Sequence, residues 1–343
     1  MHRLMFVLSG EHKTLPVAEA SAAIKAEHKA FKVLEQLDQI LIAETRASPE
    51  ILASRLAMCR EICRHICTSG ATEGEILETV GSSDIVDLIP HGKSFAVRVE
   101  RVKRSAPAID KIELSRKLAG AIAEEVDFKV DLVNPQIEFL GVLTGEKCVF
   151  GITAARADRG QFTRRRPTSR PAFHPSTLKP ALARCMVNLA RTSRGGTFLD
   201  PFCGVGGILL EAGLIGAKLV GVDIERDMID GSKTNLEAGG VKNFQLMVGD
   251  ARKLPALEVD SIATDPPYGR QSTTGGTELD KLYSEALPSI AGVLKRRGYL
   301  CITSPAEIEL DELAKSAGLR KIEKHEQRVH RSLTRRIYVF KKK

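Results

Sequence analysis

Short apolar runs alternate with amphipathic stretches along the C-terminal half of the chain. Runs of four to six residues that end at Gly, Pro or Asp are typical of buried strands, and the stretches between them have the period of helices. The expected strands cover residues 197–200, 219–223, 244–248, 259–264 and 299–303, and the expected helices cover residues 208–215, 228–238, 279–294 and 308–317. This alternation predicts a mostly parallel α/β sheet with helices on both faces.

Two further strands, near residues 321–329 and 335–340, follow one another without a helix between them. Strands joined in this way form a hairpin, so we expect an antiparallel strand at the edge of the sheet.

The N-terminal half mixes strands and helices without a regular order. It predicts strands over 4–8 and 95–102, helices over 17–27 and 113–125, and a hairpin of 136–143 with 148–154 around Gly145. In residues 49–67, apolar residues recur at spacings of three and four, which predicts one long amphipathic helix. Cys59, Cys63 and Cys67 on this stripe, with His65 nearby, are better interpreted as small buried apolar side chains than as metal ligands.

Composition narrows the class of protein. The 343 residues are 43% hydrophobic and 27% charged, which excludes collagen-like and fully disordered chains. No apolar run reaches the ~18 residues of a membrane helix, and the residues near Phe6 are too few for the core of a secretion signal. The seven cysteines include no Cys-x-x-Cys pair, so we expect no metal site, a reducing compartment and a cytoplasmic protein.

Positive charge is concentrated in two segments. The chain carries a net charge of +8, yet residues 156–170 alone carry +5 and residues 320–343 alone carry +8, so the remaining residues are net negative. Gly and Pro bracket the first segment, which we interpret as a linker between the two halves. Because the guanidinium fork matches phosphate, this pattern favours a polyanionic partner. The arginines expected to contact it are Arg156, Arg159, Arg164, Arg165 and Arg166.

A glycine-rich turn follows the first strand of the C-terminal half. In the sequence from Asp200 to Gly207, Gly204 and Gly206 allow the backbone to approach a ligand closely, and the next helix offers free N–H groups. The dinucleotide fingerprint would require glycine at position 209, where this chain has Leu209, which argues against NAD and FAD.

Aspartates at three successive strand ends favour an adenosine cofactor without a pyrophosphate. Asp223 suits the two ribose hydroxyls, Asp250 the adenine edge, and Asp200 the ammonium of a methionine group. Each Asp alone could equally cap a helix or turn. Together they meet in the crevice where such sheets bind their ligands.

The segment Asp265-Pro-Pro-Tyr-Gly269 follows the fourth strand and has the residues needed to methylate a base amine. The lone pair of an exocyclic amine is delocalised into the ring. Hydrogen-bond acceptors that favour a tetrahedral nitrogen make the amine reactive, and here they are the Asp265 carboxylate and the Pro266 carbonyl, which consecutive prolines hold rigid. Tyr268 offers a face on which an extruded base can stack. A plain proline-rich turn is the alternative interpretation.

These motifs resemble those of a known family. The C-terminal half resembles class I S-adenosylmethionine-dependent methyltransferases with an Asp-Pro-Pro-Tyr motif, and the N-terminal half is similar to THUMP-bearing RNA modification enzymes, chiefly in residues 130–135 and the basic strand 95–104. The whole chain is most similar to the archaeal tRNA (guanosine-10 N2)-methyltransferases, with residues 273–283 and 330–336 as the most family-specific pieces.

The resemblance implies a Rossmann-like class I methyltransferase sheet, mostly parallel with an antiparallel edge strand, preceded by an α+β THUMP-containing RNA-binding half. It implies a ferredoxin-like α+β subdomain over 1–68, a THUMP domain over 69–155, an Arg-rich linker over 156–170 and the methyltransferase domain over 171–343. Residues 171–180 would close over the methionine end of S-adenosyl-L-methionine. The residues expected at this cofactor are His174, Asp200, Cys203, Gly204, Gly206, Asp223, Ile224, Asp250, Ala251 and Asp265.

The implied activity is transfer of one or two methyl groups to N2 of guanosine 10 in tRNA, with Asp265, Pro266 and Tyr268 as the catalytic residues. Some family members work with a small zinc-binding activator protein, and the resemblance permits that partner. Three alternatives stay open. The base amine could be adenine N6 or cytosine N4 of another RNA or of DNA, since both pose the same lone-pair problem. The target could be a guanine N2 in rRNA, or the protein could be a non-catalytic RNA-binding protein.

Overall fold

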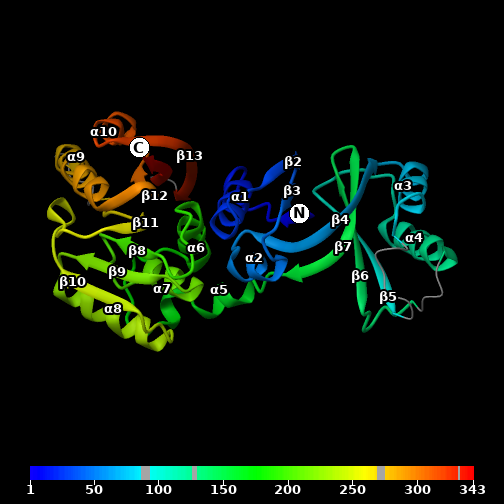
Figure 1. Ribbon diagram of the computed structural model, residues 1–343, viewed down its shortest axis with the longest axis horizontal. Coiled ribbons are helices and arrows are strands. Elements are labelled where there is room, and N and C mark those ends of the chain that lie inside the picture. The colour runs from blue at the N-terminus through cyan, green and yellow to red at the C-terminus, as the bar shows by residue number, and fades with distance from the viewer. Residues whose placement is uncertain (86–92, 126–129, 269–274, 331–332) are drawn as a thin grey trace. The chain divides into compact units, whose positions relative to one another are not determined.

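The computed structural model describes residues 1–85, 93–125, 130–268, 275–330 and 333–343 (Figure 1). Contacts divide the chain into two compact units. The first contains Met1–Glu11, His28–Ser54 and Cys59–Asp158, and the second contains His12–Glu27, Arg55–Met58 and Arg159–Lys343. Two short N-terminal segments therefore belong to the unit formed by the C-terminal half. Gly269 and residues 273, 274, 331 and 332 of the expected motifs lie outside the described residues.

The first unit is built on one seven-stranded sheet in the order β2-β3-β1-β4-β7-β6-β5. Neighbouring strands pair antiparallel, except for β5 and β6, which pair in parallel. The strands are β1 (His2–Leu8), β2 (Lys32–Leu37), β3 (Ile40–Thr45), β4 (Cys59–Gly70), β5 (Phe95–Arg101), β6 (Ile137–Thr144) and β7 (Lys147–Arg156). The predicted hairpin around Gly145 is confirmed as β6 and β7. Through β4 and β7, the sheet continues from the N-terminal residues into the segment that resembles THUMP.

Helices α3 (Glu73–Gly81) and α4 (Lys111–Glu125) cover part of this sheet. Their apolar residues pack with Phe95, Phe139 and Phe150 in one core cluster. Thr72 caps α3, because its hydroxyl accepts a hydrogen bond from the Glu75 N–H at 3.4 Å. The short helix α2 (Pro49–Arg55) precedes β4.

The prediction of one helix over residues 49–67 is wrong. The helix ends at Arg55, and residues from Cys59 onward form the central strand β4, which pairs with β1 and β7. Ile62 and Cys63 are both fully buried although they face opposite sides of the sheet, so burial on both faces hides the alternation that identifies a strand. Cys, Ile and Thr are also poor helix formers, so pairing on both edges decides the conformation.

The second unit contains a seven-stranded sheet in the order β10-β9-β8-β11-β12-β14-β13. The strands are β8 (Thr197–Asp200), β9 (Lys218–Asp223), β10 (Phe244–Val248), β11 (Val259–Thr264), β12 (Leu294–Pro305), β13 (Leu319–His330) and β14 (Leu333–Lys342). The final hairpin is confirmed, and β14 is the strand that runs antiparallel to both of its neighbours. In the sheet β14 lies one place in from the edge, between β12 and the edge strand β13. Strand β13 precedes β14 in the chain and is connected to β12 through α10.

Helices cover both faces of this sheet (Figure 1). Helices α6 (Pro180–Leu189), α7 (Gly207–Ile215) and α8 (Arg226–Ala238) contribute to one core cluster, and α9 (Gly275–Val293) and α10 (Asp311–Ser316) contribute to the other. Segments α5 (Gly160–Arg164), η2 (Pro167–Ser169) and η3 (Ala251–Lys253) are short. The predicted doubly wound arrangement is confirmed. In the described part of the chain, no helix is long and apolar enough to cross a membrane.

Helix α1 (Leu15–Glu27) packs against α6 through a buried polar cluster. The Glu19 carboxylate is fully buried and accepts hydrogen bonds from the backbone N–H groups of Ala57 and Met58 at 2.9 and 2.8 Å, and from the Asn188 side chain at 2.8 Å. Arg55 donates to Asn188 Oδ1 at 3.0 Å and to the Thr192 carbonyl at 2.8 Å. These bonds explain why the two N-terminal segments belong to the second unit.

Candidate active site

Four aspartates line the carboxyl-terminal edge of the sheet in the second unit. Asp250, Asp223, Asp200 and Asp265 follow or end β10, β9, β8 and β11, which are neighbours in that order. Because these strands are parallel, their carboxyl ends share one edge, where open α/β sheets bind ligands. The sequence analysis expects Asp200, Asp223 and Asp250 to face one crevice, and the strands that these three residues end or follow are neighbours in the sheet.

The glycine turn after β8 adopts backbone conformations that favour glycine. Gly204 and Gly206 have φ angles of +49° and +78°. A Cβ atom at Gly206 would also lie 2.5 Å from the Ser232 hydroxyl oxygen. The Gly204 N–H donates to Asp223 Oδ2 at 2.8 Å, so the turn is tied to the end of the next strand. Helix α7 then begins without a side-chain cap, which leaves N–H groups at its N-terminus.

A pocket lies between residues 174–178 and the glycine turn, and its lining includes His174, Gly204, Asp200 and Asp265. Cys203 also contributes, although only 4% of it is exposed, and burial raises the pKa of its thiol. The pocket therefore lies among the glycine turn, the segment expected to close over the cofactor, and Asp265 of the expected catalytic segment.

Asp200 is the buried charge of this pocket. It is 1% exposed, and its Oδ1 accepts hydrogen bonds from the Thr264 hydroxyl at 2.6 Å and the Phe202 N–H at 3.2 Å. Its Oδ2 is buried and has no hydrogen-bond partner among the described residues. Burial, with smaller contributions from Asp223 and Asp265, raises the pKa of Asp200 to about 7. An oxygen in this state is suited to a cationic ligand group.

Asp223 and Asp250 differ in how much of each carboxylate the protein already uses. Asp223 Oδ1 accepts from the Glu225 N–H at 3.1 Å, and the neighbouring Ile224 is 64% exposed, an apolar surface suited to a flat ring. The Asp250 carboxylate is held by Arg252 through bonds of 2.6 to 3.0 Å and caps the short helix that begins at Ala251. In this structure Asp250 therefore caps a helix, which is the alternative role that the sequence analysis gives to each of these aspartates. The resemblance found in the sequence implies S-adenosylmethionine as cofactor. The unpartnered Asp200 Oδ2 suits its ammonium group, and the exposed Ile224 side chain suits its adenine ring.

Residues 265–268, the expected catalytic segment, are linked by short hydrogen bonds. Asp265 Oδ1 accepts from the Thr303 hydroxyl at 2.5 Å and from the Tyr268 hydroxyl. Asp265 Oδ2 lies 3.5 Å from Arg335 Nη2. Burial raises the pKa of the Asp265 carboxyl, while Arg335 and the two hydroxyl groups oppose that shift. Pro266 is buried beside it.

Thr303 and Arg335 are site residues that the sequence did not identify. Thr303 lies within the apolar strand β12, and Arg335 lies in β14, 67 residues from its partner Tyr268. The only available signal was that residues 330–336 belong to a family-specific segment, which gave no role to any single residue.

The arginines expected to contact RNA have different surroundings. Arg165 donates through two bonds, at 3.0 and 2.9 Å, to Glu211, a fully buried residue, so its guanidinium is used inside the protein. Arg159, Arg164 and Arg166 are exposed, and Arg166 donates to the Ser169 hydroxyl at 3.1 Å.

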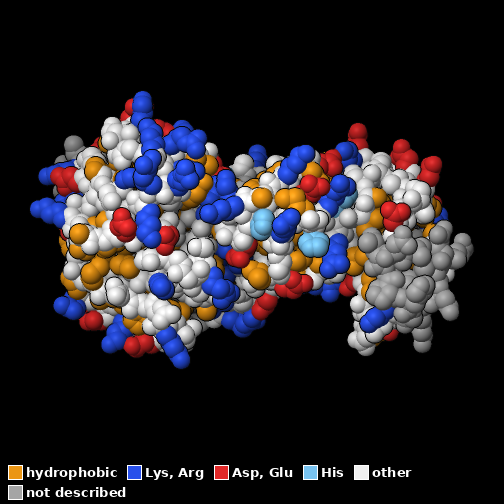
Figure 2. Space-filling model, in the orientation of Figure 1, with side chains coloured by type: hydrophobic (Ala, Val, Ile, Leu, Met, Phe, Trp, Pro, Cys, Tyr) orange, Lys and Arg blue, Asp and Glu red, His pale blue; other side chains and the backbone are white. Residues whose placement is uncertain are grey.

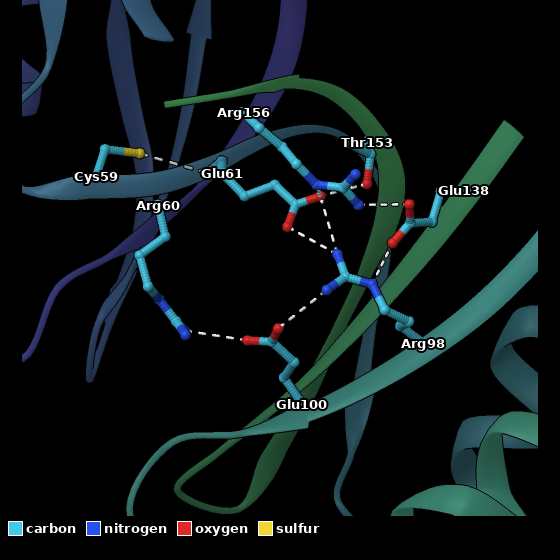
Figure 3. A network of polar contacts seen from close by, with 8 residues as sticks. All are labelled: Cys59, Arg60, Glu61, Arg98, Glu100, Glu138, Thr153 and Arg156. Atoms are coloured by element: carbon cyan, nitrogen blue, oxygen red, sulfur yellow. Dashed lines mark hydrogen bonds and ion pairs between the residues drawn. The ribbon is translucent and has the colours of Figure 1, made fainter. Parts of the chain in front are cut away.

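Arg156 belongs to a polar network on the sheet of the first unit (Figure 3). Its guanidinium contacts Glu138 and lies 3.4 Å from Glu61, and Arg98 binds the same two glutamates. Glu61 is only 6% exposed and also accepts from the Thr153 hydroxyl at 2.6 Å. Much of the charge of Arg156 and of the basic strand β5 is therefore balanced within the sheet.

Part of the second basic segment, residues 320–343, lies on the surface of the second unit, whereas residues 337–340 are buried. Figure 2 shows Lys and Arg side chains gathered over the region of α10 and β13. The exposed basic residues of these elements are Lys315, Arg320, Lys321, Lys324 and Arg328. Some are partnered, since Lys324 lies 3.2 Å from Glu309 and Lys321 2.5 Å from Asp311.

Comparisons with known proteins agree with this architecture. A family described as RMKL-like, methyltransferase domain, matches residues 167–337, and the THUMP domain family matches residues 70–153. The crystal structure of TrmN from Thermus thermophilus has a TM-score of 0.53 at 20% identity and covers all of both chains. A putative methyltransferase crystallised with SAH has a TM-score of 0.52 at 15% identity and covers 100% of this chain and 99% of its own. These two structures support the fold.

Full-length relatives identify the family. The tRNA (guanine(10)-N2)-dimethyltransferase of Methanothermobacter thermautotrophicus is 36% identical over 99% of both chains. The enzyme of the same name from Pyrococcus abyssi is 36% identical and covers 94% of this chain and 95% of its own. With similarity that runs from end to end and both constituent domains matched, the chain belongs to the family of the tRNA (guanine(10)-N2)-dimethyltransferases.

Proposed function

We propose that this protein uses S-adenosyl-L-methionine to methylate the N2 amine of guanosine 10 in tRNA, giving N2-methylguanosine and, after a second transfer, N2,N2-dimethylguanosine. The observation that carries the proposal is the Asp265-Pro-Pro-Tyr268 segment at the end of β11, beside a pocket with an unpaired buried carboxylate oxygen. The end-to-end similarity to enzymes named for this activity supports it.

Bound S-adenosylmethionine supplies a methyl group activated by a sulfonium. The protein has to orient the guanine amine and accept a proton. The Asp265 carboxylate accepts one amine N–H and the Pro266 carbonyl the other, which localises the nitrogen lone pair. As positive charge develops on the nitrogen, its proton passes to Asp265 or to water. The Tyr268 hydroxyl, which now donates to Asp265, gives up this bond, and the ring becomes a stacking surface for the base.

Asp200 is our candidate for the cofactor ammonium, which leads to a prediction on pH. Since burial raises the pKa of Asp200 to about 7, the carboxylate is mostly protonated at about pH 6 and mostly ionised at about pH 7.5. Cofactor affinity measured by calorimetry should therefore increase several-fold between these pH values. Asp200→Asn should bind more weakly and lose most of this dependence. An equal pH dependence in both proteins would contradict the assignment.

Of the remaining cofactor residues, His174, Cys203 and Gly204 line this pocket, and the others lie in the glycine turn or at or just after the ends of the neighbouring strands. His174, Cys203, Gly204 and Gly206 would surround the methionine end, Asp223 and Ile224 the ribose and the ring, and Asp250 and Ala251 the adenine edge. We propose that Asp250 contacts the adenine edge. It does so either after Arg252 has released one of the Asp250 carboxylate oxygens or with Arg252 still bound to them.

Transfer RNA is the proposed partner, held by phosphate contacts in the exposed part of the segment 156–170. Each phosphate contact contributes about −0.7 to −0.9 to the slope of log affinity against log salt concentration. Replacing Arg159, Arg164 and Arg166 together with alanine should reduce both the affinity for tRNA and the magnitude of this slope, as measured by filter binding. A wild-type slope near zero would contradict the phosphate-contact proposal.

Mass spectrometry of nucleosides tests the function directly. Undermodified tRNA incubated with the enzyme and S-adenosylmethionine should gain methylated guanosine at position 10. The same tRNA with adenosine at that position should stay unlabelled, and labelling that survives the change would favour another base amine. We also expect a cytoplasmic enzyme. Addition of a small zinc-binding activator protein to this assay would test whether the enzyme works with that partner.

A further inference from the structure

The side chain of Arg335 contacts both functional residues of the catalytic segment. Its Nε donates a hydrogen bond to the Tyr268 hydroxyl at 2.5 Å, and its Nη2 lies 3.5 Å from Asp265 Oδ2. Its guanidinium carbon is 5.3 Å from the centre of the Tyr268 ring, within the range of a cation–π contact. The Arg335 guanidinium thus contacts both the Asp265 carboxylate, which is proposed to bind the amine, and the Tyr268 ring, which is proposed to stack on the base.

The backbone at Arg335 is fixed by strand pairing on both sides. Arg335 lies in β14, where it pairs with Pro305 of β12 on one side and with Gln327 of β13 on the other. Only 7% of the residue is exposed. Burying a guanidinium costs free energy unless it is paired, and the partners of this one include the two residues that the reaction needs.

We propose that Arg335 is a positioning residue of the methyl transfer, which orients Tyr268 for base stacking and holds the Asp265 carboxylate ready to accept the amine. This inference rests on the proposed function. It assigns a role to a segment, 330–336, that the sequence marked as family-specific without explaining it.

The groups that face Asp265 show why a cation is needed. Thr303 of β12 and Tyr268 donate hydrogen bonds, Asp200 of β8 is a nearby acid, and the Tyr283 hydroxyl of α9 donates to the Thr303 carbonyl at 3.1 Å. Burial disfavours ionisation of Asp265. Arg335 opposes this effect and therefore favours the charged form of the carboxylate.

The contact with Tyr268 has a second consequence. A base amine that binds Asp265 Oδ1 would displace the Tyr268 hydroxyl from that oxygen. The Arg335 Nε–H still holds that hydroxyl, so the ring is retained near the pocket when its bond to Asp265 is lost. Lysine could keep the charge but could not provide both the planar stacking surface and this directed bond.

The experiment measures single-turnover methylation of tRNA against pH for the wild type, Arg335→Met, Arg335→Lys and the control Arg336→Met. Arg336 is the next residue of β14, and its contacts go to Glu309 at 2.6 Å and Glu326 at 3.1 Å, away from Asp265. We expect Arg335→Met to lower the rate about tenfold to a hundredfold at neutral pH, with a deficit that shrinks as pH rises, because Asp265 then ionises only at higher pH.

Arg335→Lys should keep the acidic limb of the wild type, with a lower rate and an unchanged KM for the cofactor. Arg336→Met should match the wild type in rate and profile. An Arg335→Met enzyme with wild-type rate, or with a loss that is uniform across pH, would overturn the inference. If Arg335→Met does not fold, as judged by circular dichroism, Arg335→Lys decides, and a wild-type rate in that variant overturns the inference. A wild-type enzyme that methylates no guanosine in tRNA overturns the proposed function instead.

Discussion

Replacing Asp265 with alanine is expected to lower the rate of methyl transfer by about a thousandfold and to leave the affinity for tRNA nearly unchanged. The carboxylate is the acceptor that localises the lone pair of the amine, whereas binding of RNA depends on phosphate contacts elsewhere. Single-turnover methylation and filter binding on the same preparations would measure the two effects separately.

A matched control for this substitution is Asp230→Ala. Asp230 is exposed on α8, so its replacement should change neither quantity. Equal methylation by the wild type and Asp265→Ala would refute the catalytic assignment. A parallel loss of tRNA affinity would mean that Asp265 supports binding of the RNA rather than the chemical step.

Replacing Glu19 with alanine is expected to lower the free energy of unfolding by about 3–5 kcal/mol. The change leaves the backbone N–H groups of Ala57 and Met58 and the amide of Asn188 without their acceptor in a fully buried place. Urea denaturation followed by circular dichroism measures the effect, since the chain has no tryptophan to serve as a fluorescent probe.

Glu237→Ala is the control for that measurement. Glu237 forms a pair with Lys233 at 4.0 Å on α8, and the two side chains are 57% and 61% exposed, so its loss should cost less than about 0.5 kcal/mol. Unfolding free energies that fall equally in both variants would show that the Glu19 cluster adds nothing beyond an ordinary surface pair.

The sequence predicted the second unit well because its strands have local signals. The short apolar runs that end at Asp200, at Val248 and at Thr264 match β8, β10 and β11 residue for residue, since Gly, Pro and Asp mark where each strand stops. The site aspartates could be placed for the same reason, because each comes at the end of a strand whose direction the helix alternation predicts.

The features that the sequence could not show depend on residues far apart in the chain. Pairing with β1 and β7 makes residues 59–67 a strand although their local spacing fits a helix. Arg165 looks like its neighbours in the basic segment, and only its bond to Glu211, 46 residues away, removes it from the surface. Arg335 contacts Tyr268 from 67 residues away, and no local pattern indicates that contact.

The assignment of α1 to the second unit limits how such a protein can arise. The helix lies between β1 and β2 in the chain, so a segment of the second unit interrupts the sequence of the first. This order differs from that of two units joined end to end, each formed by one continuous stretch of chain. A recombinant that takes its first 158 residues from one relative and the rest from another would have to match Glu19 and Arg55 to a foreign Asn188. Exchange of whole genes avoids that mismatch, so we expect the two halves to be inherited together.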